Sequence, residues 1–151
     1  MDKLIMAIAS GCYTGYLPIA PGTWGTLVAF PLHLLLTRLS QSGYYTSLGL
    51  IFGVAVLTAG SAEKILDRGD PGIVVIDEII GMLIGLIGAP LKALPLIMAF
   101  FLFRFFDIIK PFPASWADAH LHGGLGVVLD DVIAGIYTLL VMQLLKAWLN
   151  W

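Results

Sequence analysis

Charged residues are scarce in this chain and gather in one stretch. Only 12% of the 151 residues are charged, whereas 59% are hydrophobic. The stretch runs from Phe103 to Gly135, with Arg104, Asp107 and Lys110 ending one apolar run and Asp130 and Asp131 opening the next. Because charges among apolar residues are costly and tend to mark function, this stretch is the first candidate for a site.

A second pair of adjacent carboxylates, Asp77-Glu78, opens another apolar run. With Asp107 and the pair Asp130-Asp131, the chain offers five carboxylates, which would repel one another if they lay close together and unpaired. A hard divalent cation removes that conflict, and Mg²⁺ favours carboxylate oxygens and bridges to phosphate. We therefore expect Mg²⁺, with metal ligands among the two pairs. The alternative is that each pair is a set of first-turn acids favoured by the helix dipole.

The basic residues of the stretch suit a phosphate group. Arg104 can hold phosphate oxygens in a bidentate manner, and Lys110 can act as a point charge. On a helix, Asp107 is the i,i+3 neighbour of both residues, so simple pairing among the three stays open.

A turn rich in proline and glycine, Pro18–Thr26, precedes an apolar run. Thr23 is placed to cap the helix that follows, and a plain helix entry is one interpretation. The other is that free backbone N–H groups and the hydroxyls of Thr23 and Thr26 bind an anion.

The histidines and the single cysteine narrow the possible chemistry. His122 precedes a glycine-rich loop and is a candidate proton donor to a leaving group, although a lone loop histidine is usually only solvated. His33 lies in an apolar run and is expected to pack. Cys12 has no arginine in the position that a thiol phosphatase requires, and no nucleophile elbow or Walker A loop is present. Metal-assisted chemistry remains.

Composition favours an all-α membrane protein of one domain, residues 1–151. We expect a polytopic bundle of about five helices, preceded by a short interfacial or re-entrant segment at the N-terminus. The expected helices span Thr23–Leu39, Thr46–Leu66, Ile73–Ala89, Leu91–Ile109 and Val127–Trp151. A net charge of −2 indicates no nucleic-acid partner.

Helix parity brings the polar residues together. If five helices cross in alternation, the Pro-Gly-Thr turn, both carboxylate pairs, the Arg104–Lys110 triplet and the His122 loop share one face. A small excess of Lys and Arg on that face predicts that it is cytoplasmic. Small residues at four-residue spacing, Gly49 with Gly53 and Gly81 with Gly85, predict close helix packing.

Several of these motifs together resemble the phosphatidylglycerophosphatase A family of bacterial membrane lipid phosphatases. The matching stretches are Pro21–Thr26, Ile76–Gly81, Phe103–Pro111, His122–Gly126 and Asp130–Gly135. Their order and spacing agree from about Gly11 to the last helix, which is far more specific than any single motif. The connection Glu63–Gly72 matches poorly, and we expect it to lie outside the site.

The resemblance implies Mg²⁺-dependent hydrolysis of phosphatidylglycerophosphate to phosphatidylglycerol and inorganic phosphate, a step of phospholipid biosynthesis. It implies a multi-pass protein of the bacterial inner membrane, whose acidic site also contains Arg104, Lys110 and His122. We favour water over an aspartate as the attacking group, because water needs no special nucleophile. The oligomeric state is not indicated.

Two other classes of function stay open. A small transporter would also need charged residues, but it predicts charges spread through the depth of the bilayer. A membrane protein that binds anionic lipids without catalysis would need basic clusters, and the five carboxylates argue against it.

Overall fold

The computed structural model describes residues 1–149, and every regular element among them is helical, which confirms the all-α prediction. Trp151, the expected end of the last helix, lies outside the described residues. The elements are α1 (Asp2–Ala9), the 3₁₀ turn η1 (Thr14–Tyr16), α2 (Pro21–Leu36), α3 (Gln41–Leu66), α4 (Ile76–Gly85), α5 (Ala93–Ile109), α6 (Ala114–His120) and α7 (Gly123–Leu149).

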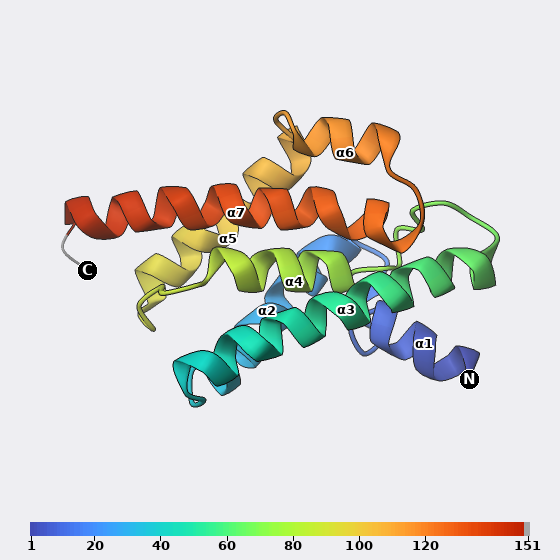
Figure 1. The fold of residues 1–151 in the computed structure, drawn as a ribbon, viewed down its shortest axis with the longest axis horizontal. Coiled ribbons are helices and arrows are strands. Elements are labelled where there is room, and N and C mark those ends of the chain that lie inside the picture. Colours follow the sequence, from blue (N-terminus) through green and yellow to red (C-terminus); the bar gives the residue numbers. More distant parts are fainter. Residues whose placement is uncertain (150–151) are drawn as a thin grey trace.

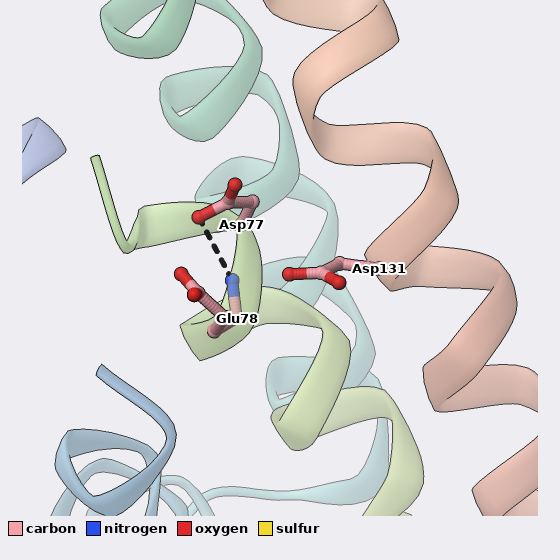
Figure 2. Close-up of side chains that lie close together, drawn as sticks. All are labelled: Asp77, Glu78 and Asp131. Carbon is pink, nitrogen blue, oxygen red and sulfur yellow. Dashed lines mark hydrogen bonds between the residues drawn. The ribbon is translucent and has the colours of Figure 1, made fainter. Parts of the chain in front are cut away.

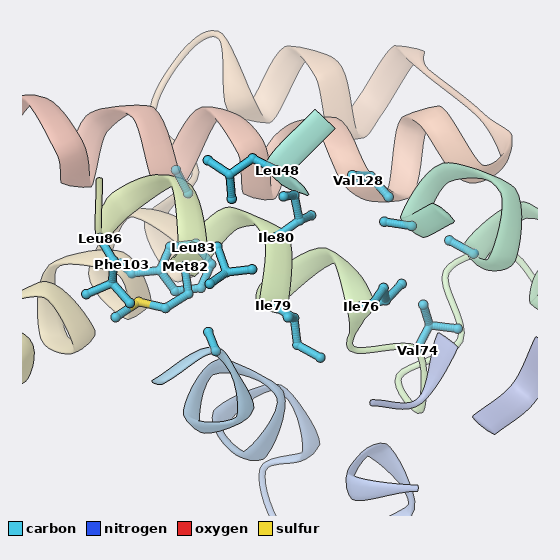
Figure 3. Packing of buried hydrophobic residues seen from close by; sticks show 14 of the residues in the cluster. Leu48, Val74, Ile76, Ile79, Ile80, Met82, Leu83, Leu86, Phe103 and Val128 are labelled. Carbon is cyan, nitrogen blue, oxygen red and sulfur yellow. The ribbon is translucent and has the colours of Figure 1, made fainter. Parts of the chain in front are cut away.

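Helix α4 lies at the centre of the bundle, between α3 and α7 in Figure 1. Its apolar side chains point in several directions into the surrounding helices, as Figure 3 shows for Ile79, Ile80 and Leu83. A helix that is apolar all round is expected to be buried, and α4 follows that rule. The first turn of α4, which carries the acidic pair, is therefore held rigidly by the core.

Glycines allow α4 and α7 to pack closely against each other. A Cβ atom on Gly81 would overlap the backbone carbonyl of Asp131, and one on Gly135 would overlap the carbonyl of Gly81. The two backbones can approach this closely only because neither residue has a side chain. The predicted packing role of Gly81 and Gly85 is thus observed, whereas Gly49 and Gly53 have no heavy atom near their missing side chains.

Helix α4 is shorter than expected, because the flanking residues are fixed in other ways. The backbone N–H of Val75 donates to the carbonyl of Ala9, which ties the chain before the helix to α1. Beyond the C-terminal end, Gly88 has a φ of +69°, a left-handed conformation that ends helices. The prediction of a helix over Ile73–Ala89 is therefore wrong at both ends.

Helix α7 begins before the expected residue. It starts at Gly123, so Asp130 and Asp131 lie about two turns inside the helix. Their explanation as first-turn acids is wrong, although it still applies to Asp77 and Glu78 at the start of α4. The Pro-rich loop between α5 and α7 contains a further short helix, α6, that was not expected.

Two helices, α3 and α7, are long and apolar enough to cross a membrane. Helix α4, with 10 residues, is about 15 Å long and is too short to cross a bilayer core of about 30 Å. The prediction of five spanning helices is therefore not confirmed. Many large apolar side chains of the other helices are nonetheless exposed, among them Leu35, Phe101 and Ile108.

Candidate active site

A cavity of about 440 Å³ opens where the start of α2, the end of α3, the start of α4 and the end of α5 meet α6 and α7. Eight of the residues expected at the site line this cavity. They are Asp77, Glu78, Arg104, Asp107, Lys110, His122, Asp130 and Asp131. The polar groups that helix parity placed on one face thus share a single space.

Three carboxylates form the innermost group of the cavity. Oxygen atoms of Asp77, Glu78 and Asp131 all lie within 4.8 Å of one another. Figure 2 shows Asp131 reaching from α7 toward the first turn of α4, where Asp77 and Glu78 sit side by side. Asp131 can reach them because the α4–α7 contact at Gly81 brings its backbone close.

Burial raises the pKa of carboxyl groups in the three-carboxylate group, and one of its oxygens has no hydrogen-bond partner. Burial, together with the neighbouring Glu78, raises the pKa of Asp77, and burial raises the pKa of Glu78 to about 8. The N–H of Glu78 donates to Oδ1 of Asp77 at 3.0 Å, but Oε2 of Glu78 is buried without a hydrogen-bond partner. Because hard oxygen ligands and excess negative charge are what Mg²⁺ requires, the residues present fit such an ion.

Arg104 lies beside the three-carboxylate group and is held by other residues. Its Nη1 atom is 2.8 Å from Oδ2 of Asp107, 4.0 Å from Oε1 of Glu78 and 3.5 Å from the hydroxyl of Thr26. A Cβ atom on Gly22 would overlap Oε1 of Glu78, so the glycine leaves room for that carboxylate. The pairing of Arg104 with Asp107, left open by the sequence, is therefore present.

Thr23 and Thr26 lie inside α2, whose N-cap is Ala20, so the predicted capping of this helix by Thr23 is wrong. Thr26 is buried and donates to the carbonyl of Gly22, and neither Thr23 nor Thr26 is part of the cavity wall. The anion site predicted from their hydroxyls stays a prediction without support from their positions.

Lys110 occupies a separate part of the cavity. Its ammonium lies 2.6 Å from Oδ2 of Asp130 and 2.8 Å from Oδ1 of Asp118. Burial alone would lower the pKa of Lys110, but hydrogen bonds to the two carboxylates outweigh it and raise the pKa. Asp130 is thus the partner of a cation rather than a member of the three-carboxylate group, and its Oδ1 is buried without a hydrogen-bond partner.

Three further acidic residues line the cavity and were not expected there: Glu63, Asp70 and Asp118. Oε1 of Glu63 accepts a hydrogen bond from the backbone N–H of Asp70 at 3.0 Å, which fixes the connection between α3 and α4. The prediction that residues 63–72 lie outside the site is therefore wrong. This stretch is rich in charged residues and lies on the face where helix parity placed the site. That combination could have identified it from the sequence.

Two of the histidines and the single cysteine lie in different surroundings. His122 is exposed and lines the cavity just before α7. His33 is buried and its Nδ1 lies 3.1 Å from the hydroxyl of Tyr44, as expected for a packing residue. Cys12 is exposed and is not among the cavity residues.

Comparison with known proteins agrees with the resemblance seen in the motifs. The family model for phosphatidylglycerophosphatase A matches residues 7–146. The phosphatidylglycerophosphatase A of Escherichia coli is 37% identical over 130 residues, covering 85% of this chain and 76% of that protein. The Haemophilus influenzae protein of the same name is 36% identical over 149 residues, covering 96% and 90%.

A third relative carries a different name. It is a putative phosphatidylinositol-3-phosphatase of Bacteroides thetaiotaomicron, 34% identical over 155 residues, with 95% of this chain and 94% of that protein covered. No solved structure matches the chain. Since the family model spans nearly the whole sequence and includes every residue of the cavity, the chain belongs to the phosphatidylglycerophosphatase A family.

Proposed function

We propose that this protein hydrolyses the terminal phosphate of phosphatidylglycerophosphate, giving phosphatidylglycerol and inorganic phosphate, with Mg²⁺ as cofactor. The observation that carries the proposal is the buried group of Asp77, Glu78 and Asp131, with Arg104 beside it in one cavity. Family membership supplies the substrate class, since two of the relatives are named for this reaction.

The charge of the cavity explains why a cation is needed. Asp77, Glu78 and Asp131 hold the ion in this proposal, and bound Mg²⁺ would neutralise them and polarise the phosphate oxygens. Arg104 then offers its guanidinium to the phosphate, while Asp107 keeps it in place through the 2.8 Å contact. Lys110, held between Asp118 and Asp130, supplies a second positive charge to the head group.

Hydrolysis requires one bond to form and one to break at phosphorus. A water oxygen attacks phosphorus, and the bond from phosphorus to the glycerol oxygen breaks. The leaving oxygen needs a proton, and His122 is placed at the edge of the cavity to provide it. A carboxylate near the phosphorus can accept the proton of the attacking water. Asp107, which pairs with Arg104, is one of these carboxylates.

The proposed setting is the bacterial inner membrane. The chain acts as a single membrane-embedded domain, residues 1–151, that crosses the bilayer several times with its cavity on the cytoplasmic side. The two apolar helices α3 and α7 and the exposed apolar side chains support the location in a membrane. There the product, phosphatidylglycerol, is released directly into the bilayer as a step of phospholipid biosynthesis.

Phosphate release by the purified protein tests the proposal. We expect release from phosphatidylglycerophosphate in Mg²⁺ and none in excess chelator, with activity restored by added Mg²⁺. Phosphatidylinositol 3-phosphate should be assayed beside it, because the Bacteroides relative is named for that type of head group. Faster turnover of the inositol lipid would transfer the proposal to that substrate. Lipid binding without any phosphate release would favour the non-catalytic alternative.

A further inference from the structure

A second hollow, lined only by apolar residues, lies between α2 and α5. These two helices carry Gly22 and Arg104, respectively. The volume of the hollow is about 350 Å³, and none of its lining residues has a polar side chain. Leu27 and Phe30 form the α2 wall, and the α5 wall includes Ile97, Phe100 and Phe101. Such a groove cannot recognise a charged or hydrogen-bonding ligand.

The groove exists because α2 and α5 pack against the central helices rather than against each other. The rings of Phe30 and Phe100 meet with their centroids 6.4 Å apart, across the groove. The walls remain open to the surroundings, since Leu27 is 39%, Ile97 53% and Phe101 65% exposed. In a membrane this face would meet lipid.

The groove and the cavity lie along the same two helices, α2 and α5. Helix α2 begins in the cavity and α5 ends there, so the two run in opposite directions. The contact between Thr26 and Arg104 marks the junction: Leu27 follows Thr26, and Phe101 precedes Arg104 by three residues. From Arg104 to Ala93 the groove side of α5 extends about 16 Å, at about 1.5 Å per residue.

We propose that the α2–α5 groove binds one acyl chain of the phospholipid whose head group occupies the cavity, an inference that rests on the proposed function. An alkyl chain has no polar atom to satisfy, which matches the lining of the groove. Bulk lipid tails are as apolar as the groove, so its effect is on orientation more than on affinity. A chain lying along α5 leaves its head group directed toward Arg104, in the position for reaction.

Photocrosslinking on the wild-type sequence tests where the chain lies. The probe is phosphatidylglycerophosphate with a diazirine in the middle of one acyl chain, irradiated in detergent micelles with Mg²⁺. We expect labelled peptides from both groove walls, with labelling that disappears when unlabelled substrate is added in excess. Labelling of the exposed α3 side chains Leu50 and Leu57 should not respond to the competitor.

Other patterns of labelling would overturn the proposal. Groove labelling that excess substrate does not reduce would assign the groove to bulk lipid. Absence of groove labelling, with competed label elsewhere, would place the chain on another face. Absence of groove labelling with no competed label at all would also overturn the proposal, because the acyl chain of the probe would then not lie in the groove.

A pair of variants tests the same idea by rate. Ile97→Trp fills the groove, whereas Leu94→Trp adds the same side chain to another exposed position of α5, 59% exposed and outside the groove lining. The measured quantity is the ratio of kcat/KM for a long-chain substrate to kcat/KM for the deacylated head group. We expect Ile97→Trp to lower this ratio at least tenfold and Leu94→Trp to leave it at the wild-type value.

The outcomes distinguish failure of the groove proposal from failure of the proposed function. If wild type releases phosphate from neither substrate, the proposed function fails, and the crosslinking still reports on the groove. If wild type hydrolyses both substrates and a folded Ile97→Trp keeps the wild-type ratio, the groove proposal fails. If Ile97→Trp does not fold, the crosslinking of the wild-type sequence decides.

Discussion

Asp130 and Asp131 are adjacent in sequence but have different partners in the structure. Asp131 joins Asp77 and Glu78, whereas Asp130 pairs with Lys110. Successive residues of an α-helix point about 100° apart, so the rotation of α7 about its own axis decides which of the two carboxylates faces α4. A sequence shows that the two acids are present, but the division between them depends on how α7 is rotated against α4.

This division predicts the effect of Asp131→Asn. The replacement keeps size and hydrogen-bonding capacity and removes one negative charge from the three-carboxylate group. If that charge holds Mg²⁺ in every turnover, its loss should cost several kcal/mol of transition-state stabilisation, on the order of a thousandfold in rate. Phosphate release should be measured at saturating Mg²⁺ and across a Mg²⁺ titration.

Asp67→Asn is the matched control. Asp67 is exposed and ends α3 with a φ of +50°, a conformation that asparagine tolerates at least as well as aspartate. We expect wild-type activity and elution. If Asp131→Asn also stays within a few-fold of wild type at all Mg²⁺ concentrations, the metal model is wrong at this position. A raised Mg²⁺ requirement alone would limit Asp131 to metal binding.

The Mg²⁺ requirement should also depend on pH. With the pKa of Glu78 at about 8 and that of Asp77 also raised, protons occupy the group below pH 8 and must leave before a metal ion binds. Raising the pH removes these protons, so the sign is a stronger apparent affinity at higher pH. We expect the Mg²⁺ concentration for half-maximal activity to fall about tenfold between about pH 6.5 and 7.5, then to level off above about pH 8.5.

Direct metal binding provides the check on that prediction. Mn²⁺ binding followed by electron paramagnetic resonance should show the same trend without turnover. Glu63→Gln, which alters a carboxylate at the cavity wall outside the three-carboxylate group, should keep the slope. A Mg²⁺ requirement that does not vary with pH would contradict the proton competition.

At the scale of elements, the contact between α4 and α7 positions Asp131 opposite Asp77 and Glu78. Gly81→Ala should push the two helices apart, because its Cβ would overlap the carbonyl of Asp131 and the ring of Phe103. Overpacking of this kind costs about 1–3 kcal/mol, and the accompanying shift should lower the rate of phosphate release. Thermal unfolding in detergent and the phosphatase assay measure the two effects.

Gly53→Ala is the control for this change. Gly53 is also inside a helix, but nothing lies within 4 Å of its missing side chain, so alanine should be neutral or stabilising by up to about 1 kcal/mol. Equal melting temperatures for Gly81→Ala and Gly53→Ala, with full activity in both, would show that the close approach of α4 and α7 is not needed.

The expected and observed bounds of the helices show how much of the fold the sequence predicts. Long apolar runs predicted the C-terminal ends of α3 and α5, at Leu66 and Ile109. The start of α3 was missed, because the helix begins at Gln41 with Ser40 as its N-cap rather than at Thr46. The start of α4 depends on a hydrogen bond from Val75 to Ala9, far away in sequence, and could not be predicted. Helix α6 is only 7 residues long, so no periodicity reveals it, and with it the Asp118 contact to Lys110 was missed.

At the scale of the whole molecule, the two ends of the bundle should lie on opposite sides of the membrane. Helix α3 has 26 residues and is about 39 Å long, enough to cross a bilayer core, and it ends at the cavity. Its first turn, near Ser42, is therefore at the other end of the molecule. The small excess of Lys and Arg expected on the cavity face favours the cytoplasmic side for the cavity in our proposal.

Cysteine labelling of intact cells tests this orientation. The chain has one native cysteine, Cys12, so Cys12→Ser provides a background free of thiols, and it should retain activity because Cys12 is not among the cavity residues. In that background, Ala119→Cys at the cavity end and Ser42→Cys at the far end are both exposed positions. A membrane-impermeant maleimide should label Ser42→Cys in intact cells and Ala119→Cys only after the membrane is opened. Labelling of Ala119→Cys from outside, with Ser42→Cys protected, would invert the orientation. Labelling of both from outside would show that α3 does not cross the bilayer, and the cavity would then have to reach its lipid from the periplasmic surface.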